Sequence, residues 1–395
     1  MTIPVKKISA FCKTGSGGTP SRSNKEFFEN GTIPWVKSGE LKNRYITEIE
    51  EYITDLAVKK SSAKLVSKGS LLIAMYGATV GEVSQLTFDA TTNQAICNIQ
   101  PDETVCDVNY LYRFLEASKP YLLSRRVGGG QPNISQGVIK DLDVLLPPLS
   151  EQRRIASILD KADELRQKRQ QAIEKLDQLL QATFIDMFGD PVLNTKNWPS
   201  NKKLGDIANI ASGITKGRKI SGKSLIEIPY LAVSNVQDKY LNLSVIKTIE
   251  ASDEEIERYK LQQGDLLLTE GGDPDKLGRG TLWNNEVNEC IHQNHVFRVR
   301  LTSKDFTPNY LNWIVGSEYG KRYFLKSAKQ TTGIASINMG QLKKLPLLTP
   351  PLDLQIQFDE RCNKFHQIKK QLAESYKDIN NLFKSLQNQA FSGNL

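Results

Sequence analysis

Two long stretches of the chain carry apolar residues at alternating steps of three and four, the pattern of helices that pair lengthwise. The first stretch covers residues 149–190 and the second covers residues 352–395, and a Pro-Pro pair precedes each of them. Gly189 and Gly393 mark their expected ends. About 39 residues of helix would reach roughly 58 Å, which exceeds the width of a domain of about 150 residues. The pattern therefore predicts two long helices that project from their domains and pair as a coiled coil.

The apolar positions expected in the seam of this coiled coil share one register. Two amphipathic helices that each cover their own domain remain the alternative. If the helices pair antiparallel, the segments before them lie at opposite ends, related by an approximate two-fold axis. The predicted seam consists of Ile155, Ile158, Leu165, Leu176, Leu179, Phe358, Phe365, Ile368, Leu372, Ile379 and Leu382.

In the segments before the helices, residues 1–148 and 191–351, the pattern changes to short apolar runs bounded by glycine, proline, serine and asparagine. Buried strands with sharp ends are indicated by GSLLIAMYG and GDLLLTEGG. Helices are indicated by NYLYRFLEAS and NYLNWIVGSEYGKRYFLKSA, where apolar residues recur at steps of three and four. Each segment is therefore expected to form an α+β domain.

Several short motifs occur twice in the chain, in the same order. The distance between the two copies grows from 195 residues near the start to 203 at the Pro-Pro pairs. Such order indicates duplication of one large unit rather than a solenoid of short repeats. The sequence thus predicts two homologous α+β domains, separated by two long helices that form an antiparallel, pseudo-two-fold symmetric coiled coil. The paired motifs begin at Ile33 and Ile228, Gly69 and Gly264, Asn109 and Asn309, and Pro147 and Pro350.

Composition places the chain among globular proteins, because 39% of its 395 residues are hydrophobic and 24% are charged. No apolar run reaches the length of a membrane span, and the first residues lack the apolar core of a signal peptide. The five cysteines form no C-x-x-C pair and leave an odd one over. That usage favours a reducing compartment, and we expect a cytoplasmic protein.

The formal net charge is +8, and most of the excess lies in residues 191–351. A polyanionic partner such as double-stranded DNA fits this charge, as does an ordinary basic protein without such a partner. Polar and basic residues that follow or interrupt strand-like runs could contact DNA from loops. The candidate DNA-binding residues are Lys37, Ser38, Tyr76, Thr79, Arg125, Arg126, Gln131, Asn133, Arg218, Ser234, Asn235, Arg279, Lys329, Gln330 and Asn338.

The sequence offers no catalytic or metal site. An adenine methyltransferase needs an [NDS]-P-P-[YF] motif to hold a flipped base, and neither Pro-Pro pair fits it. With three histidines in the chain, little is available for acid–base chemistry. Cys290, His292 and His295 are spaced like metal ligands, but on a strand His295 would face away from the other two.

GRKISGKS, residues 217–224, matches the phosphate-binding loop of many nucleotide hydrolases. That loop works between a buried strand and a helix whose N-terminus faces the phosphates. Only four residues separate Ser224 from the strand-like run IPYLAV, which is too few for such a helix. A basic loop that contacts a DNA backbone is the better interpretation.

Four segments of the chain resemble a known protein family. This chain is similar to the specificity subunit of type I restriction–modification enzymes. The four segments that carry the resemblance are PPLSEQRRIASILDKADEL, its weaker copy PPLDLQIQFDERCNKFHQI, IPWVKSGEL and GGGQPNIS. The resemblance covers the whole chain and includes the order domain, helix, domain, helix. It implies a non-catalytic subunit, with target-recognition domains at residues 1–148 and 191–351 and conserved helices at residues 149–190 and 352–395.

In that family, each recognition domain reads one half of a split DNA sequence, while the paired helices set the gap and dock the partner subunits. The resemblance implies two modification subunits, which carry S-adenosylmethionine and methylate adenine N6. It also implies restriction and translocase subunits, which use ATP and Mg²⁺. The chain itself is expected to hold no cofactor, to contact no membrane, and to lie in a bacterial or archaeal cytoplasm.

The two halves of this chain depart from each other as well as from the family pattern. Asp353-Leu354-Gln355 replaces Ser150-Glu151-Gln152, and ASIN replaces PNIS. The stretches between the repeated motifs differ widely, so the two half-sites should differ and the full target should be asymmetric. A stand-alone DNA-binding regulator and, on GRKISGKS alone, a nucleotide-binding protein are the competing interpretations. An adjacent gene for an adenine methyltransferase would distinguish the specificity subunit from both.

Overall fold

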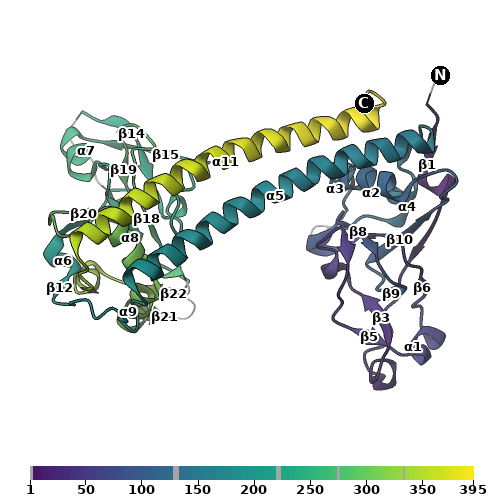
Figure 1. Ribbon diagram of the computed structural model, residues 1–395, viewed down its shortest axis with the longest axis horizontal. Helices are drawn as coiled ribbons and strands as arrows, with labels where there is room; N and C mark the ends of the chain where they lie inside the picture. Colours follow the sequence, from purple (N-terminus) through teal and green to yellow (C-terminus); the bar gives the residue numbers. More distant parts are fainter. Residues whose placement is uncertain (1–2, 128–132, 219–223, 274–275, 332–333) are drawn as a thin grey trace. The chain divides into compact units, whose positions relative to one another are not determined.

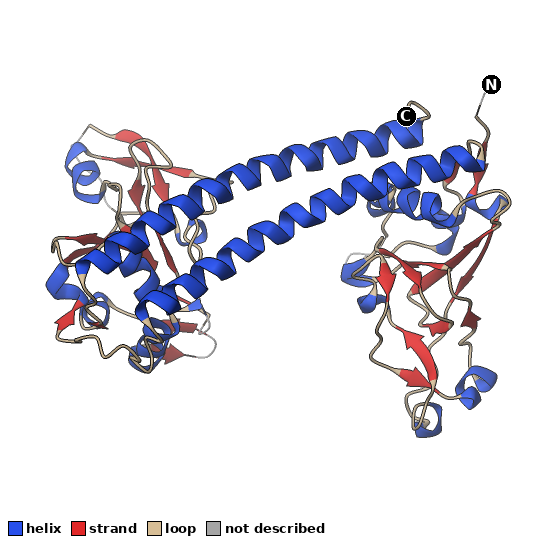
Figure 2. Ribbon diagram, in the orientation of Figure 1, coloured by secondary structure: helices blue, strands red, loops and turns tan. Residues whose placement is uncertain are grey.

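The computed structural model of the chain describes residues 3–127, 133–218, 224–273, 276–331 and 334–395. The chain divides into two compact units. The first unit contains residues 1–171 and 373–395, and the second contains residues 172–372. Two long helices, α5 (Leu149–Phe188) and α11 (Leu352–Ser392), run through both (Figure 1). Each unit combines helices with sheets (Figure 2), which confirms the predicted α+β fold.

The first unit is built on a mixed sheet in the order β2-β10-β7-β8-β4 and a second sheet in the order β5-β3-β9-β6. A short pair, β1 with β11, joins the start of the unit to the residues just before α5. The strands are β1 (Val5–Lys7), β2 (Cys12–Ser16), β3 (Ile33–Val36), β4 (Tyr45–Ile46), β5 (Tyr52–Ile53), β6 (Leu65–Val66), β7 (Leu71–Ala74), β8 (Val83–Leu86), β9 (Ala90–Thr92), β10 (Ile96–Pro101) and β11 (Asp143–Leu145). The helices are α1 (Asp55–Lys60), α2 (Val108–Ala117), α3 (Lys119–Ser124) and α4 (Gln136–Lys140), and the 3-10 helices are η1 (Ile8–Ala10), η2 (Lys25–Phe27), η3 (Ser38–Glu40) and η4 (Gly77–Thr79).

The second unit repeats the central part of this topology, with one strand fewer in each of its two sheets. Its sheets run β13-β20-β16-β18 and β15-β14-β19, and β12 pairs with β23. An additional ribbon runs β17-β22-β21. The strands are β12 (Lys202–Lys203), β13 (Ala208–Ser212), β14 (Ile226–Leu231), β15 (Lys247–Ala251), β16 (Leu266–Thr269), β17 (Gly271–Gly272), β18 (Gly280–Leu282), β19 (Ile291–His292), β20 (Val296–Leu301), β21 (Lys329–Thr331), β22 (Ile334–Ser336) and β23 (Pro346–Leu347). The helices are α6 (Leu204–Ile207), α7 (Asp253–Tyr259), α8 (Pro308–Gly316), α9 (Glu318–Ser327) and α10 (Met339–Lys343), with the 3-10 helix η5 (Val233–Asn235).

The repeated sequence motifs mark equivalent places in the two units. Gly69 and Gly264 precede the buried central strands β7 and β16, with φ angles of 86° and 87°. Glycine adopts this left-handed conformation without the cost that a side chain would add. Every residue of β7 and of β16 is buried, as their continuous apolar runs predict.

The glutamine of the repeated PPL-x-x-Q motif joins each long helix to its unit. Gln152 is fully buried; its amide donates to the carbonyls of Val105 (3.0 Å) and Pro147 (2.8 Å) and accepts from the backbone N–H of Asp107 (2.8 Å). Gln355 makes the same three bonds, to Asp305, Pro350 and Thr307. A buried amide must satisfy its hydrogen bonds, and this requirement explains why the glutamine recurs.

Within each unit, α5 and α11 lie side by side and antiparallel (Figure 1). In the first unit, Leu159 of α5 belongs to the same core as Phe383 and Ala390 of α11. In the second unit, Phe184 of α5 packs on Phe358 of α11 at 5.5 Å between ring centroids. The structure therefore confirms that the two long helices pair.

The predicted seam is wrong at four positions. Leu165 (59% exposed), Leu179 (53%), Ile368 (45%) and Leu382 (57%) point away from the helix pair. The buried or paired position is the next residue along the chain in each case, and two of these four residues are polar. Those next residues are Arg166, which stacks on Phe383, Leu180, Lys369, which pairs with Asp177, and Phe383 itself.

The other predicted seam residues lie nearer the pair. Ile155 and Phe358 are buried. The remaining five are half-buried: Ile158, Leu176, Phe365, Leu372 and Ile379. Over the described residues, no helix is both long and apolar enough to cross a membrane.

Candidate nucleic-acid interface

A polar surface lies where the central strand β7 of the first unit ends. Tyr76 follows this strand and is 41% exposed. Its backbone bridges to Asn133, which in turn bridges to Val127. The 3-10 helix η4 follows Tyr76, and η3 lies beside it. The structure thus brings together four predicted residues: Ser38, Tyr76, Thr79 and Asn133.

The second unit has a corresponding surface at the end of β16. Gly271 pairs with Ser336, and Ser336 pairs with Lys329. These three positions correspond to Tyr76, Asn133 and Val127 in the duplicated sequence. We call the set in each unit its end ribbon: Tyr76, Val127 and Asn133 in the first, and β17, β22 and β21 in the second. Lys329 and Gln330, both predicted, lie in β21.

Two predicted arginines of the first unit are exposed near its end ribbon. The Arg125 guanidinium lies over the ring of Tyr121, 5.0 Å from its centroid. Arg126 donates from Nε to the carbonyl of Leu123 at 2.8 Å. Because both side chains are exposed, they suit contacts to phosphates. Gln131 lies outside the described residues.

Lys37 is held in place by acidic neighbours. Its Nζ lies 2.8 Å from a carboxylate oxygen of Glu50 and 2.9 Å from one of Glu51. These hydrogen bonds raise the pKa of the Lys37 amine. The lysine therefore supports the loop before β5, and a role in contacting phosphate would require both ion pairs to break.

Three predicted residues of the second unit make contacts within the chain, and the prediction is corrected for Asn235, which is buried. Arg218 binds Glu255 in a bidentate pair (2.5 and 2.7 Å) and donates to the Glu250 carbonyl. Asn235 is 4% exposed and makes three backbone hydrogen bonds that close the loop after η5. Asn338 caps α10 by accepting from the backbone N–H of Gln341 at 2.9 Å. Asn235 therefore has no free side-chain group to read a base, whereas Arg218 and Asn338 stay predictions.

The last two predicted residues lie at the surface of the second unit. Ser234 is exposed in η5. Arg279 is half-buried, and its Nη1 donates to the side chain of Gln237 at 3.0 Å. Its backbone carbonyl accepts from Thr269 at the end of β16, which places Arg279 next to the strand that leads into the end ribbon.

Sequence reasoning missed a glutamate–histidine pair at the end ribbon of the second unit. Oε2 of Glu270 lies 2.6 Å from Nδ1 of His295, and both side chains are solvent-accessible. The Glu270 backbone accepts from Ile337 and donates to His295, just as Met75 of the first unit bonds to Ile134 and Ala95. An alignment of the two halves would have shown glutamate in place of methionine here. The predicted set contained basic, amide, hydroxyl and tyrosine side chains but no carboxylate, so it did not include Glu270.

The two histidines considered as metal ligands, His292 and His295, contact other groups of the protein. His292 is fully buried, and its Nδ1 lies 2.7 Å from the Val296 carbonyl. Burial lowers the pKa of His292 to about 4, while His295 faces Glu270 instead. Over the residues that the structure describes, no group of three or more His, Cys, Asp or Glu side chains could hold a metal ion.

The GRKISGKS segment leads into a strand. Residues 219–223 lie outside the described residues, and β14 begins at Ile226, two residues after the motif ends. The described chain after Ser224 therefore has no room for a helix that would cap a phosphate. Arg218, within the motif, is bound to Glu255.

Comparisons with known proteins agree on one family. The family model of the type I restriction modification DNA specificity domain matches the chain twice, over residues 2–175 and 195–375. The specificity subunit of the type I restriction enzyme EcoKI from Escherichia coli K12 is 24% identical over 391 residues, covering 93% of this chain and 84% of its own length. The MjaIX specificity subunit of Methanocaldococcus jannaschii is 30% identical over 254 residues. That match covers 59% of this chain and only 57% of the archaeal protein.

Solved structures show the same fold. A chain from a study of complex assembly and conformational transition in a type I R-M system aligns with a TM-score of 0.61 at 15% identity, over the full length of both chains. The S subunit of a type I restriction-modification system from M. genitalium aligns with a TM-score of 0.53 at 14% identity, over 99% of each chain.

Proposed function

This chain belongs to the type I restriction modification DNA specificity family, and from that premise we propose that it selects the DNA sequence on which a type I complex acts. In this role the chain is the non-catalytic specificity subunit. Each unit binds one half of a bipartite target in double-stranded DNA. The observation that carries the proposal is the duplicated unit, which presents a similar end ribbon in each copy with different side chains.

The differences between the two end ribbons support an asymmetric target. Tyr76 in one unit corresponds to Gly271 in the other, and Met75 corresponds to Glu270. Base edges are distinguished by their donors, acceptors and methyl groups. Met75 is buried, so at equivalent places the first unit presents the exposed Tyr76 and the second unit the accessible Glu270. Different groups select different bases, so the two half-sites differ.

The long helices suit two further roles in this proposal, setting the distance between half-sites and docking the modification subunits. Helix α5 is continuous over 40 residues and α11 over 41. Both leave large apolar side chains exposed, and these offer apolar contacts to the modification subunits. These side chains are Leu165, Leu179, Ile185, Ile356, Ile368 and Leu382.

In this proposal the partner subunits carry out the catalysis. Two modification subunits supply S-adenosylmethionine and methylate adenine N6, and restriction subunits supply ATP- and Mg²⁺-dependent translocation and cleavage. The test is reconstitution of the full chain with its modification subunit on plasmid DNA. Methyl transfer should require both proteins and should stop when either is omitted. A stand-alone regulator would instead bind its DNA tightly alone and leave methylation by the partner unchanged.

A prediction for Glu270 follows from its place at the end ribbon. A carboxylate repels phosphates but accepts hydrogen bonds from the exocyclic amine of cytosine. Glu270→Gln should weaken discrimination at one base of the second half-site by about 10- to 100-fold, the size of a contact of 1–3 kcal/mol. The measurement is the methylation rate on targets with each base of that half-site changed in turn.

The matched control is Glu318→Gln, a glutamate of α9 that is exposed and paired with Arg322. This control should retain every base preference. If Glu270→Gln slows methylation of all targets equally, Glu270 does not read a base.

A further inference from the structure

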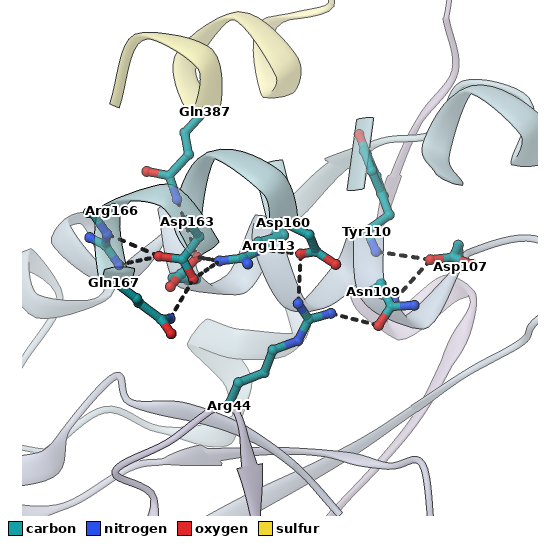
Figure 3. Close-up of polar contacts among 11 residues, drawn as sticks. Arg44, Asp107, Asn109, Tyr110, Arg113, Asp160, Asp163, Arg166, Gln167 and Gln387 are labelled. Atoms are coloured by element: carbon teal, nitrogen blue, oxygen red, sulfur yellow. Dashed lines mark hydrogen bonds and ion pairs between the residues drawn. The ribbon is translucent and has the colours of Figure 1, made fainter. Parts of the chain in front are cut away.

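A partly buried cluster of charges connects the domain part of the first unit to the long helices (Figure 3). The side chain of Arg113 on α2 is 2% exposed. Its Nε donates to Asp160 at 2.8 Å, and its Nη1 donates to Asp163 at 3.0 Å and to Glu116 at 2.9 Å. Burial opposes the charge, but the three carboxylates outweigh it and raise the pKa of Arg113. The guanidinium is thus charged and surrounded by acceptors in fixed directions.

The cluster spans three elements. Arg113 and Glu116 belong to α2, Asp160 and Asp163 belong to α5, and Gln387 of α11 reaches Glu116 at 3.4 Å. On α5, Arg166 donates to Asp163 at 2.6 Å and stacks on Phe383 of α11. A domain helix and both long helices are therefore held by one network of charge-assisted hydrogen bonds.

Arg44 extends the network toward the end ribbon. Its Nη1 donates to Asp160 at 2.6 Å, and its Nη2 donates to Asn109 at 2.8 Å (Figure 3). Arg44 lies just after η3, which is beside η4 and the predicted DNA-contacting residues. A single carboxylate of α5 thus binds both the domain helix and the loop that approaches the candidate interface.

The second unit builds the equivalent joint from aromatic rings. Trp313 occupies the position of Arg113 and stacks on Phe184 of α5 at 5.6 Å. Phe358 of α11 completes the cluster at 5.9 Å from Trp313. Lys239 occupies the position of Arg44 and lies 3.5 Å from the Trp313 ring centroid. At this position the second unit therefore uses aromatic packing where the first unit uses ion pairs, and the ionic version needs another explanation.

Direction is the property that distinguishes the two joints. Aromatic packing tolerates small rotations, whereas a guanidinium bound by several carboxylates accepts them in a narrow range of angles. Buried ion pairs contribute little net stability compared with apolar replacements, but they can specify geometry. The charged joint therefore fixes the angle between the recognition part of the first unit and its segment of α5.

We propose that Arg113, Asp160 and Arg44 are positioning residues that fix the angle of the first recognition domain on α5, and through it the spacer length that the complex accepts. This inference rests on the proposed function. The radius of gyration of a domain of this size is about 15 Å. At that distance from the joint, a rotation of roughly 13° moves a DNA contact by ~3.4 Å, which is the rise of one base pair. If the domain can rotate by about this angle on α5, the complex also accepts targets whose spacer is one base pair longer or shorter.

The experiment uses the full chain with its modification subunit and a panel of DNA targets. All targets carry both half-sites, with the native spacer or a spacer longer or shorter by one base pair. Asp160→Asn removes the charge shared by Arg113 and Arg44 and keeps the side-chain shape. We expect the preference for the native spacer to fall by about tenfold, with the bases of both half-sites still required. Glu164→Gln, an exposed partner of Lys168 on the same helix, should keep the native preference.

A second variant, Arg44→Met, removes only the extension toward η3 and leaves Arg113 with its carboxylates, so it tests the same claim if Asp160→Asn fails to fold. It should broaden spacer choice in the same direction. Uniform slowing on all targets, with the spacer preference unchanged, would overturn the inference and leave the network a structural joint. A wild-type complex that methylates no bipartite target would contradict the proposed function instead.

Discussion

Lengthening α5 and α11 by seven residues each should increase the accepted spacer by about three base pairs and leave both half-sites unchanged. Seven helical residues add about 10 Å at 1.5 Å per residue, and B-DNA rises about 3.4 Å per base pair. The insertions belong between Gln171 and Ala172 and between Leu372 and Ala373, where the two units divide. A full heptad keeps the paired faces of the helices nearly in register.

The measurement is methylation of targets whose spacers vary one base pair at a time. An insertion of four residues in both helices is the control, because it rotates the faces by about 40° and should reduce activity at every spacer. The outcome that counts against the account is an inserted heptad that changes the bases read while the spacer stays the same.

Replacing Arg113 with alanine should cost the first unit about 3–5 kcal/mol of unfolding free energy, the usual cost of breaking a buried ion pair from one side. The change leaves Asp160, Asp163 and Glu116 close together without their shared cation. It also removes a side chain that is almost wholly buried. Protection of the α2 amides from hydrogen exchange reports this loss in the full chain.

The second unit should keep its stability in this variant, because Arg113 contacts only residues of the first unit in the interactions described. Lys168→Ala, which breaks an exposed pair on α5, is the matched control and should leave α2 protection unchanged. Equal loss of protection in both units, or none in α2, would show that the cluster does not stabilise the first unit.

The fold could be predicted largely from the duplication. The repeated motifs include residues that the backbone conformation or buried hydrogen bonds require. Gly69 and Gly264 have positive φ, and Gln152 and Gln355 make three buried hydrogen bonds each. Such positions accept few residue types, so they remain readable in a single sequence. The long helices begin at Leu149 and Leu352, directly after the Pro-Pro pairs.

The face of each long helix could not be predicted from apolar residues alone. Leu165 and Leu382 fit a seven-residue pattern but are exposed. Arg166 and Lys369, one step from predicted positions, contact the other helix through a ring and a carboxylate. A polar helix interface is invisible to a pattern that counts hydrophobic positions, because its stabilising contacts are ion pairs and hydrogen bonds.

The candidate site was harder to predict because a polar side chain has many possible partners far away in the sequence. In the sequence Arg218 has no evident partner, whereas in the fold it forms an ion pair with Glu255. Asn235 bonds to carbonyls seven and ten residues further along. The sequence predicts that Tyr76 and Asn133 each follow or interrupt a strand-like run, but only the fold shows that they pair with each other.

We propose that this chain directs adenine methylation to an asymmetric, gapped target. The decisive measurement is base-resolution mapping of N6-methyladenine in cells with and without the gene. One methylated motif should depend on the gene, with two different half-sites separated by a fixed number of unread bases. A gene-dependent methylated palindrome without a gap, or a methylation pattern that does not change when the gene is removed, would contradict it.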